Sequence, residues 1–174
     1  MSRVAAVVLA AGEGSRFGGA KQLLTLPEVL RRLQSAPLSE VVVVEGAHAL
    51  GTAATGARIV PCSDWARGPG ASLRAGLGAL EDDVDAALVV LADGPELAAG
   101  AVTHVIESWE REWGDVVAAS YAGARSHPLL IARTAWAAIP DEGLRAVPAR
   151  LVPCDAFGAP GDVDRPEDLP ERLR

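Results

Sequence analysis

The chain has 174 residues, a formal net charge of −7 and 49% hydrophobic residues. This length fits a single domain spanning residues 1–174, and the hydrophobic fraction argues against a disordered chain. The acidic balance argues against a nucleic-acid-binding protein, because phosphate backbones are bound by basic surfaces.

The two cysteines, Cys62 and Cys154, lie far apart and form no Cys-x-x-Cys pair. We interpret them as small core residues in a reducing cytoplasm, which argues against a disulfide scaffold or a cysteine-type zinc site. No signal peptide is visible, and no apolar stretch reaches the ~18 residues that a membrane span needs. We therefore expect a cytoplasmic protein with neither a nucleic-acid partner nor a membrane partner.

Short apolar runs alternate with helix-like patterns along the chain. Most of these runs show no polar alternation, which is typical of strands buried on both faces of a mainly parallel sheet. Strands alternating with helices favour an open α/β layer fold. The predicted strands are 4–9, 41–44, 57–60, 86–91, 115–120, 128–132 and 150–153, and the predicted helices are 27–33, 71–80, 99–113, 133–139 and 166–172.

Two of these regions make more specific predictions. A glycine-containing turn at 121–125 separates two predicted strands and indicates an antiparallel hairpin within the sheet. In the helix predicted at 99–113, one face is apolar and includes Trp109 and Trp113. Ligands of such sheets bind beyond the carboxyl ends of the strands, so the residues that follow each strand are the site candidates.

The first strand runs into a glycine-rich segment, Leu-Ala-Ala-Gly-Glu-Gly-Ser-Arg-Phe-Gly-Gly-Ala-Lys at 9–21. A strand, a glycine-rich turn and a helix can direct backbone N–H groups at phosphates. A dinucleotide fingerprint is disfavoured because Phe17 stands where the third glycine is needed. A P-loop is disfavoured because Lys21 is followed by Gln22 and not by Ser or Thr.

A third interpretation uses two flexible cations in this segment, Arg16 and Lys21. Together with the glycines they suit a triphosphate that must release pyrophosphate, since they stabilise charge on the leaving group. Lys21 is the only lysine beside 15 arginines. Its compact ammonium can act where a planar guanidinium cannot. The competing interpretation is an ordinary glycine-rich surface loop.

Three aspartates are candidates for metal binding. Asp93 follows the strand predicted at 86–91 and precedes Gly-Pro, so it is either a Mg²⁺ ligand or a turn residue. Asp162 and Asp164 would lie about 7 Å apart on one face of an extended segment, where both can face one cation. Asp164 could instead cap a helix that starts near Pro166.

The 9–21 segment resembles the nucleotidyltransferases that make molybdopterin cytosine or guanine dinucleotide, most closely the molybdenum cofactor cytidylyltransferases. The resemblance implies a Rossmann-like, three-layer α/β sandwich that binds a nucleoside triphosphate and Mg²⁺. It also implies metal binding by Asp93, which matches the family's Asp-x-Pro, and by Asp164, with Asp162 as the alternative. The nucleotide-binding residues that it implies here are Leu9, Ala10, Ala11, Gly12, Gly14, Ser15, Arg16 and Lys21, and the catalytic residues are Arg16, Lys21 and Asp93.

Weaker resemblances occur in the middle of the chain. Residues 62–73 resemble the family's Asn-Pro-x-Trp-x-x-Gly-x-x-x-Ser-Leu, which implies that Gly68 and Ser72 border the nucleotide base. Cys62 stands in place of the asparagine, and Ser72 could equally be a helix-capping hydroxyl. The segments Ser126-His127-Pro128 and Asp141-x-Gly143-x-Arg145 resemble the acceptor-side motifs, although a lone histidine is often structural. They imply acceptor binding by His127, Pro128 and Arg145.

We therefore expect a Mg²⁺-dependent enzyme that moves a nucleotide from CTP or GTP to a phosphorylated acceptor, with molybdopterin favoured. Ala11 favours CTP, because the guanylyltransferases carry glycine there. Segments after Lys21 and Arg145 are shorter than in the family. A catalytically weak paralogue that binds nucleotide or assists a molybdoenzyme partner is therefore an alternative. A cytidylyltransferase acting on a sugar phosphate or methylerythritol phosphate is another, and an NAD-binding oxidoreductase ranks third.

Overall fold

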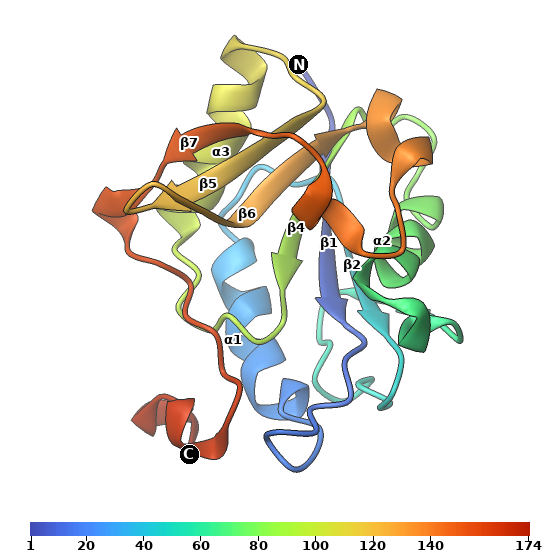
Figure 1. Ribbon diagram of the computed structural model, residues 1–174, viewed down its shortest axis with the longest axis vertical. Coiled ribbons are helices and arrows are strands. Elements are labelled where there is room, and N and C mark those ends of the chain that lie inside the picture. Colours follow the sequence, from blue (N-terminus) through green and yellow to red (C-terminus); the bar gives the residue numbers. More distant parts are fainter.

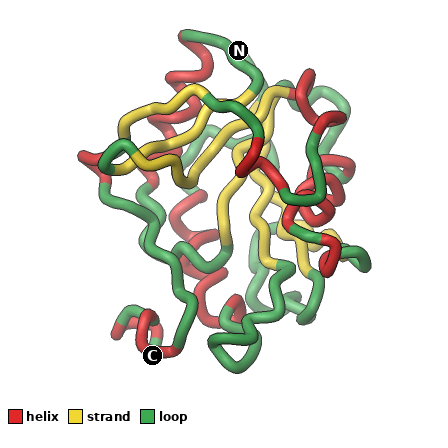
Figure 2. The backbone as a smooth tube through the Cα atoms, viewed as in Figure 1, coloured by secondary structure: helices red, strands yellow, loops and turns green.

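Seven strands form one mixed sheet in the computed structural model, which describes residues 1–174 (Figures 1 and 2). The strand order is β3-β2-β1-β4-β6-β5-β7. Only β6 runs antiparallel to its neighbours, so the predicted hairpin within a mainly parallel sheet is confirmed. The strands are β1 (Val4–Ala10), β2 (Val41–Glu45), β3 (Arg58–Pro61), β4 (Ala86–Leu91), β5 (Val116–Tyr121), β6 (Ala124–Ala132) and β7 (Arg150–Pro153).

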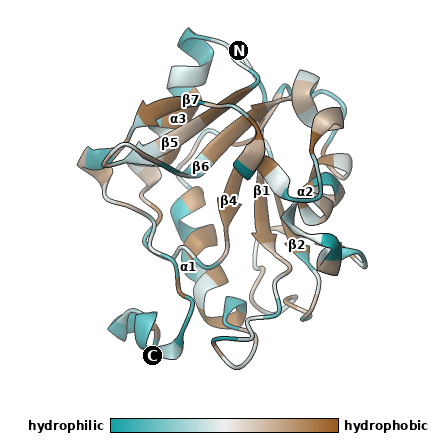
Figure 3. Cartoon of the chain, viewed as in Figure 1, coloured by the Kyte–Doolittle hydropathy of each residue, from teal (hydrophilic) through white to brown (hydrophobic).

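Helices cover both faces of the sheet and complete the predicted three layers. The helices α1 (Gln22–Leu33) and α3 (Ala99–Arg111) pack on one face, and α2 (Pro69–Gly78) packs on the other. Strand β1 alternates between the two resulting cores, since Val8 faces α1 and α3 whereas Val7 faces α2. Apolar side chains on both faces explain why its sequence shows no polar alternation, as the brown strands in Figure 3 illustrate.

Helix α1 begins at Gln22, five residues before the predicted start at Pro27. Pro27 lies inside the helix on its exposed side, so the hydrogen bond that proline cannot donate is lost where water can compensate. The opposite side buries Leu26, Val29 and Leu33, which holds the helix on the sheet.

The prediction for Trp113 was wrong. Helix α3 ends at Arg111 because Glu112 adopts an extended conformation, and Trp113 is 64% exposed instead of buried. Its ring packs on that of Trp109, with the ring centroids 4.4 Å apart. The helix predicted at 133–139 is a 3₁₀ segment, Arg133–Ala138. The one predicted at 166–172 is two 3₁₀ turns, Pro166–Asp168 and Glu171–Leu173, separated by the extended Pro170.

The carboxyl ends of β1, β2 and β4 point toward the bottom of Figure 1, where several loops gather. The C-terminal segment, drawn in red, descends along the sheet to the same end. No helix of the chain is both long enough and apolar enough to cross a membrane. The site candidates predicted after each strand are therefore brought to one end of the molecule.

Candidate functional site

The loop between β1 and α1 turns tightly around the carbonyl of Gly14. That oxygen accepts the backbone N–H groups of Phe17, Gly18 and Gly19 at 3.0, 2.9 and 3.3 Å. Gly14 has a φ of +68°, and a Cβ there would lie 2.2 Å from the carbonyl oxygen of Gly19. A side chain at position 14 is therefore excluded both by the backbone conformation and by the available space.

Lys21 is buried and holds three segments together. Its side chain reaches the end of β4, where Nζ lies 2.9 Å from Oδ2 of Asp93. The same ammonium donates a 2.5 Å hydrogen bond to the carbonyl of Val163 in the C-terminal segment. With only 8% of the residue exposed, Lys21 is a fixed cation and not the flexible one expected for this loop.

Asp93 combines an ion pair with an unsatisfied oxygen. Its Oδ2 pairs with Lys21, but its Oδ1 is buried without a hydrogen-bond partner. The backbone carbonyl of Asp93 accepts the N–H of Val163 at 2.9 Å, so the C-terminal segment is fastened directly beside this carboxylate. A buried acceptor without a donor costs free energy, and this one marks a place for a ligand cation or donor.

Asp164 and Asp162 differ in their surroundings: Asp164 lines the cleft described below, and Asp162 lines the cavity beside it. Asp164 accepts a 2.6 Å hydrogen bond from the guanidinium of Arg16, which lowers the pKa of the Asp164 carboxyl. Burial raises the pKa of Asp162, and the nearby charge of Asp93 adds to this effect. Asp164 does not cap the following turn, because Arg165 occupies the N-cap position. The carboxylate of Asp168 accepts the N–H groups of Asp164 and Arg165.

A cleft of about 520 Å³ opens over this loop and the end of β4. All of the residues predicted to bind nucleotide line it, together with Asp93 and Asp164 but without Asp162. The residues predicted to bind nucleotide therefore lie together around one cleft, and their role in binding stays a prediction. The predicted residues in its lining are Leu9, Ala10, Ala11, Gly12, Gly14, Ser15, Arg16, Lys21, Gly68 and Ser72.

Sequence reasoning missed two prominent residues of the cleft, Gln22 and Trp65. Gln22 donates from Nε2 to the carbonyl of Gly12 at 2.9 Å, while its buried Oε1 has no partner. Trp65 packs over Gly46 so closely that a Cβ at position 46 would lie 2.7 Å from the indole. A polar residue directly after Lys21 was a usable signal for Gln22, whereas no local pattern places Trp65 against Gly46.

A second cavity, of about 780 Å³, adjoins the cleft. The two share Leu9, Pro69 and Leu91 in their linings. His127 and Arg145, for which the resemblance implies acceptor binding, line the second cavity, and Asp162 joins them. Pro128 is buried in β6 and is not among the lining residues, and the sequence missed Arg125, Ser126 and Glu142.

His127 is uncharged at neutral pH. Burial lowers the pKa of its imidazole to about 4, and the positive charge of Arg125 adds to this effect although Asp93 opposes it. A neutral imidazole can donate one hydrogen bond and accept another. His127 is thus suited to holding a polar group of a ligand in the cavity, not to supplying positive charge.

Two motif residues turn out to have structural contacts. Asp141 receives the guanidinium groups of Arg67 and Arg74, with Arg67 at 3.0 Å, so it ties its loop to α2 and to the 3₁₀ segment Trp65–Arg67. Cys62, which replaces the family asparagine, is buried in the core on the α2 side and does not line the cleft. Neither residue lines the cleft.

No group of three or more histidine, cysteine, aspartate or glutamate side chains could hold a metal ion by itself. Mg²⁺ usually takes one or two carboxylates and completes its shell with water and substrate phosphates. The unsatisfied Oδ1 of Asp93 meets that requirement, and Asp164 lines the same cleft. The residues present therefore fit a Mg²⁺ ion that binds together with a nucleotide.

Comparison with known proteins gives one family and many similar structures. Residues 6–154 match the MobA-like NTP transferase domain. The comparison with curated proteins found no match.

Rv0371c from Mycobacterium tuberculosis H37Rv is 26% identical, with a TM-score of 0.80 over 96% of this chain and 95% of that one. The same protein has also been solved as a manganese complex. A nucleotidyl transferase from Methanothermobacter thermautotroptrophicus is 20% identical, with a TM-score of 0.77 over 97% of this chain and 94% of that one. CMP:2-keto-3-deoxy-manno-octonic acid synthetase in complex with CTP is 15% identical, with a TM-score of 0.76 over 95% of each chain. The last two similarities show a shared fold.

Proposed function

Because the chain belongs to the MobA-like NTP transferase family, we propose that it transfers a nucleoside monophosphate from CTP to a phosphorylated acceptor, with molybdopterin favoured. The observation that supports this most directly is the junction of the cleft and the second cavity, which share Leu9, Pro69 and Leu91. A nucleotide in the cleft and an acceptor in the cavity would meet there. Asp93 lies in the wall of the cleft, close enough to the cavity to act electrostatically on His127.

In the proposed reaction, an oxygen of the acceptor phosphate attacks the α-phosphorus. The new P–O bond forms as the bond to the β-phosphate breaks, and pyrophosphate leaves with its electron pair. A phosphate monoester is largely dianionic at neutral pH, so the attacking oxygen needs no protein base. Catalysis then rests on positioning and on charge stabilisation.

A bound triphosphate would weaken both ion pairs of the cleft, that of the exposed Arg16 more readily than that of the buried Lys21. Arg16 now pairs with Asp164, and Lys21 pairs with Asp93. An incoming triphosphate competes with these carboxylates for the cations, which leaves carboxylate oxygens available. Bound Mg²⁺ would supply positive charge next to the reacting phosphates, held by Asp93 together with Asp164, the favoured second ligand, or Asp162.

The choice of CTP over GTP rests on the wall of the cleft beside Ala11. The Ala11 methyl group lies close to Gly46, where an added Cβ would be 2.9 Å from it and 2.7 Å from Trp65. This packing fixes Ala11 and Trp65 in the wall, and a methyl group at position 11 leaves less room for a purine than the glycine of the guanylyltransferases. The discrimination available from one methyl group is modest, about 1–3 kcal/mol.

The choice of acceptor rests on the lining of the second cavity. Its apolar walls are formed by Leu9, Leu73, Val89, Leu91 and Leu129. Its polar side chains are those of Arg125, Ser126, His127, Glu142, Arg145 and Asp162. An apolar wall suits a fused-ring acceptor such as molybdopterin. Sugar phosphates and methylerythritol phosphate have many hydroxyl groups that such a wall would leave unsatisfied.

A weak or inactive paralogue is the alternative, and the pairing of Lys21 with Asp93 favours it to some degree. A cation that is buried and already neutralised resists exchange. Such a protein would bind nucleotide, or a molybdoenzyme partner, without turning over.

Pyrophosphate release tests the proposal. The protein is incubated with Mg²⁺, each of the four nucleoside triphosphates and a panel of acceptors: molybdopterin, a sugar phosphate and methylerythritol phosphate. We expect release with CTP and molybdopterin, with GTP slower. Release with another acceptor alone would correct the substrate. Nucleotide binding without release from any acceptor would establish the inactive paralogue.

A further inference from the structure

Arg125, near the start of β6, is a cation without a counter-ion. Its Nη1 donates to the carbonyl of Val147 at 2.5 Å and its Nη2 to that of Leu144 at 2.8 Å. These bonds fasten the 3₁₀ turn Gly143–Ala146, which carries Arg145, to the hairpin. Carbonyl groups satisfy part of the guanidinium, but they do not neutralise its charge.

Three other arginines also hold two carbonyls each. Arg174 donates to the carbonyls of Leu169 and Glu167 and has no ion pair, but it is exposed to water. The other two make the contrast clear. Arg133 donates to the carbonyls of Glu81 and Val84, and Asp82 lies 3.6 Å from it. Arg150 donates to the carbonyls of Ser108 and Glu112, and the Glu112 carboxylate lies 3.9 Å from it. Arg125 has no carboxylate within 4.0 Å.

The surroundings of Arg125 are also unlike those of the other two. All three are half-buried, and burial lowers the pKa of the Arg125 guanidinium below its usual value. Arg125 differs in facing a cavity. It lines the 780 Å³ cavity together with Arg145, which forms no ion pair either. Glu142 and Asp162 line the same cavity, but neither comes within ion-pair distance of Arg125. An uncompensated charge that is partly removed from water is costly unless a ligand supplies the opposite charge.

We propose that Arg125 is the fixed cation that binds the phosphate group of the acceptor in the second cavity. This inference rests on the proposed function and adds a substrate-binding residue to it. A guanidinium presents five donors in a rigid fork, and the two carbonyls occupy one donor each of Nη1 and Nη2. The remaining donors can hold a phosphate, and Arg145 adds a second positive charge from the turn that Arg125 itself fixes.

The same chemistry could come from another source, namely the β- and γ-phosphates of the nucleotide. The two sources differ in where they bind, because the nucleotide belongs to the cleft lined by Arg16 and Lys21, and Arg125 is not in that lining. The two hypotheses therefore differ in one testable respect, which holds only if Arg125 binds the phosphate of the acceptor. Loss of Arg125 should weaken binding of a free phosphate while CTP is already bound.

The test uses inorganic phosphate as the probe. Phosphate is titrated calorimetrically into the full-length protein saturated with CTP, and CTP is titrated separately. The proteins are the unmodified chain, Arg125→Met, Arg125→Lys and Arg133→Met. Arg133→Met is the matched control, because it removes an arginine that also bridges two carbonyls but lies at the opposite end of the sheet.

We expect phosphate affinity to fall about tenfold in Arg125→Met and less in Arg125→Lys, which keeps the charge but loses the fork. We expect it to be unchanged in Arg133→Met, and CTP affinity to be equal in all four proteins. Should Arg125→Met fail to fold, the Arg125→Lys result alone decides, with at least a threefold loss expected.

Three outcomes overturn the inference. One is unchanged phosphate affinity in both Arg125 variants. Another is weakened CTP binding without weakened phosphate binding, which would assign Arg125 to the nucleotide. The third is an equal loss in Arg133→Met, which would show a general structural effect. If the chain binds no CTP, the proposed function fails, and the same phosphate titrations without CTP still test Arg125.

Discussion

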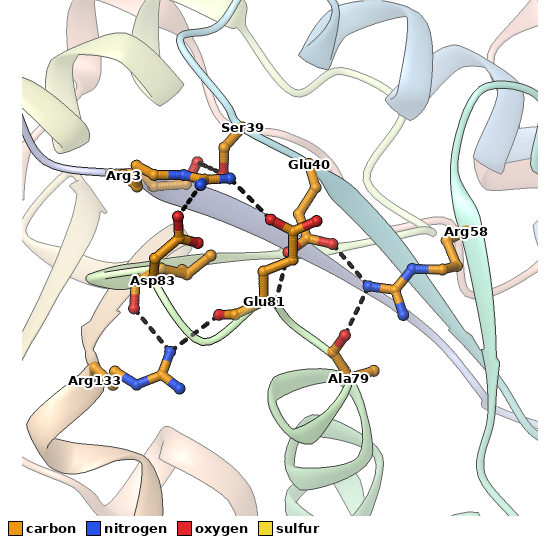
Figure 4. Close-up of polar contacts among 10 residues, drawn as sticks. Arg3, Ser39, Glu40, Arg58, Ala79, Glu81, Asp83 and Arg133 are labelled. Atoms are coloured by element: carbon orange, nitrogen blue, oxygen red, sulfur yellow. Dashed lines mark hydrogen bonds and ion pairs between the residues drawn. The ribbon is translucent and has the colours of Figure 1, made fainter.

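Both ends of the sheet carry ion pairs between basic side chains and carboxylates, yet they are built differently. At the amino end, Arg3 pairs with Glu81 and Asp83, and Arg58 pairs with Glu40 (Figure 4). These pairs fasten the segments that enter β1, β2, β3 and β4 to one another. The carboxyl end has Arg16 with Asp164, and Lys21 with Asp93.

The difference lies in what the pairs leave unsatisfied. At the amino end the second oxygen of Glu40 accepts the backbone N–H of Glu81 at 2.9 Å, so both oxygens of that carboxylate are used. Three buried side-chain atoms of the chain lack a partner, and two of them, on Gln22 and Asp93, border the cleft. Charge pairing by itself therefore does not mark a site here. Unsatisfied polar atoms beside an open volume do.

Replacing Lys21 should have the largest effect on stability. Lys21→Met leaves the Asp93 carboxylate without its cation, and removing one partner of a buried pair typically costs about 3 kcal/mol of unfolding free energy. Lys21→Arg keeps the charge, but its wider side chain overfills a buried position and should also impair transfer. Urea denaturation and turnover measure both effects. Turnover in Lys21→Arg equal to that of the unmodified chain would contradict the proposed role of the compact ammonium.

Asp93→Asn should lower nucleotidyl transfer by roughly 100-fold or more, because it weakens the carboxylate ligand that would hold Mg²⁺ beside the reacting phosphates. Asp83→Asn is the matched control, since it weakens an ion pair of the amino end and should leave turnover unchanged. Initial rates of pyrophosphate release measure both. Equal losses of turnover in the two variants would contradict the proposal that only the carboxyl end of the sheet carries the site.

The lowered pKa of His127 predicts that the stability of the folded chain depends on pH. Its pKa is about 4 in the folded chain and about 6.5 when unfolded. Between these values the unfolded state binds the proton and the folded state does not. The contribution of His127 to the free energy of unfolding is therefore fully present above about pH 6.5 and is lost as the pH falls toward 4.

His127→Gln should make the loss of unfolding free energy between pH 7 and pH 4.5 smaller, as measured by urea denaturation. His104→Gln, on helix α3, is the control and should keep the full loss. An undiminished loss in His127→Gln would show that another group is responsible.

Arg3→Met should have the smallest effect. Arg3 is exposed to water at the amino end, and surface ion pairs contribute at most about 1 kcal/mol. Thermal unfolding at low and high salt measures it, and the small loss should shrink further at high salt. A loss as large as that of Lys21→Met would mean that the two ends do not differ in how their charges are buried.

The sequence by itself determined the fold class, the order of the elements and one wall of the cleft. These features are local: buried strands are continuous apolar runs, and the glycine-rich segment 9–21 contributes most of that wall. Element ends were less predictable. Helix α1 starts before Pro27 because the proline lies on its exposed side. Trp113 is exposed because Glu112 is extended and ends α3.

Only the tertiary structure decided which charges meet. Arg16 reaches Asp164 across 148 positions, and Asp162 and Asp164 line different cavities although they are two residues apart. The missing counter-ion of Arg125 is likewise a property of its three-dimensional surroundings. Hydrophobic periodicity is recorded residue by residue along the chain. Partnerships between charges, in contrast, arise only when packing brings distant segments together and removes water from between them.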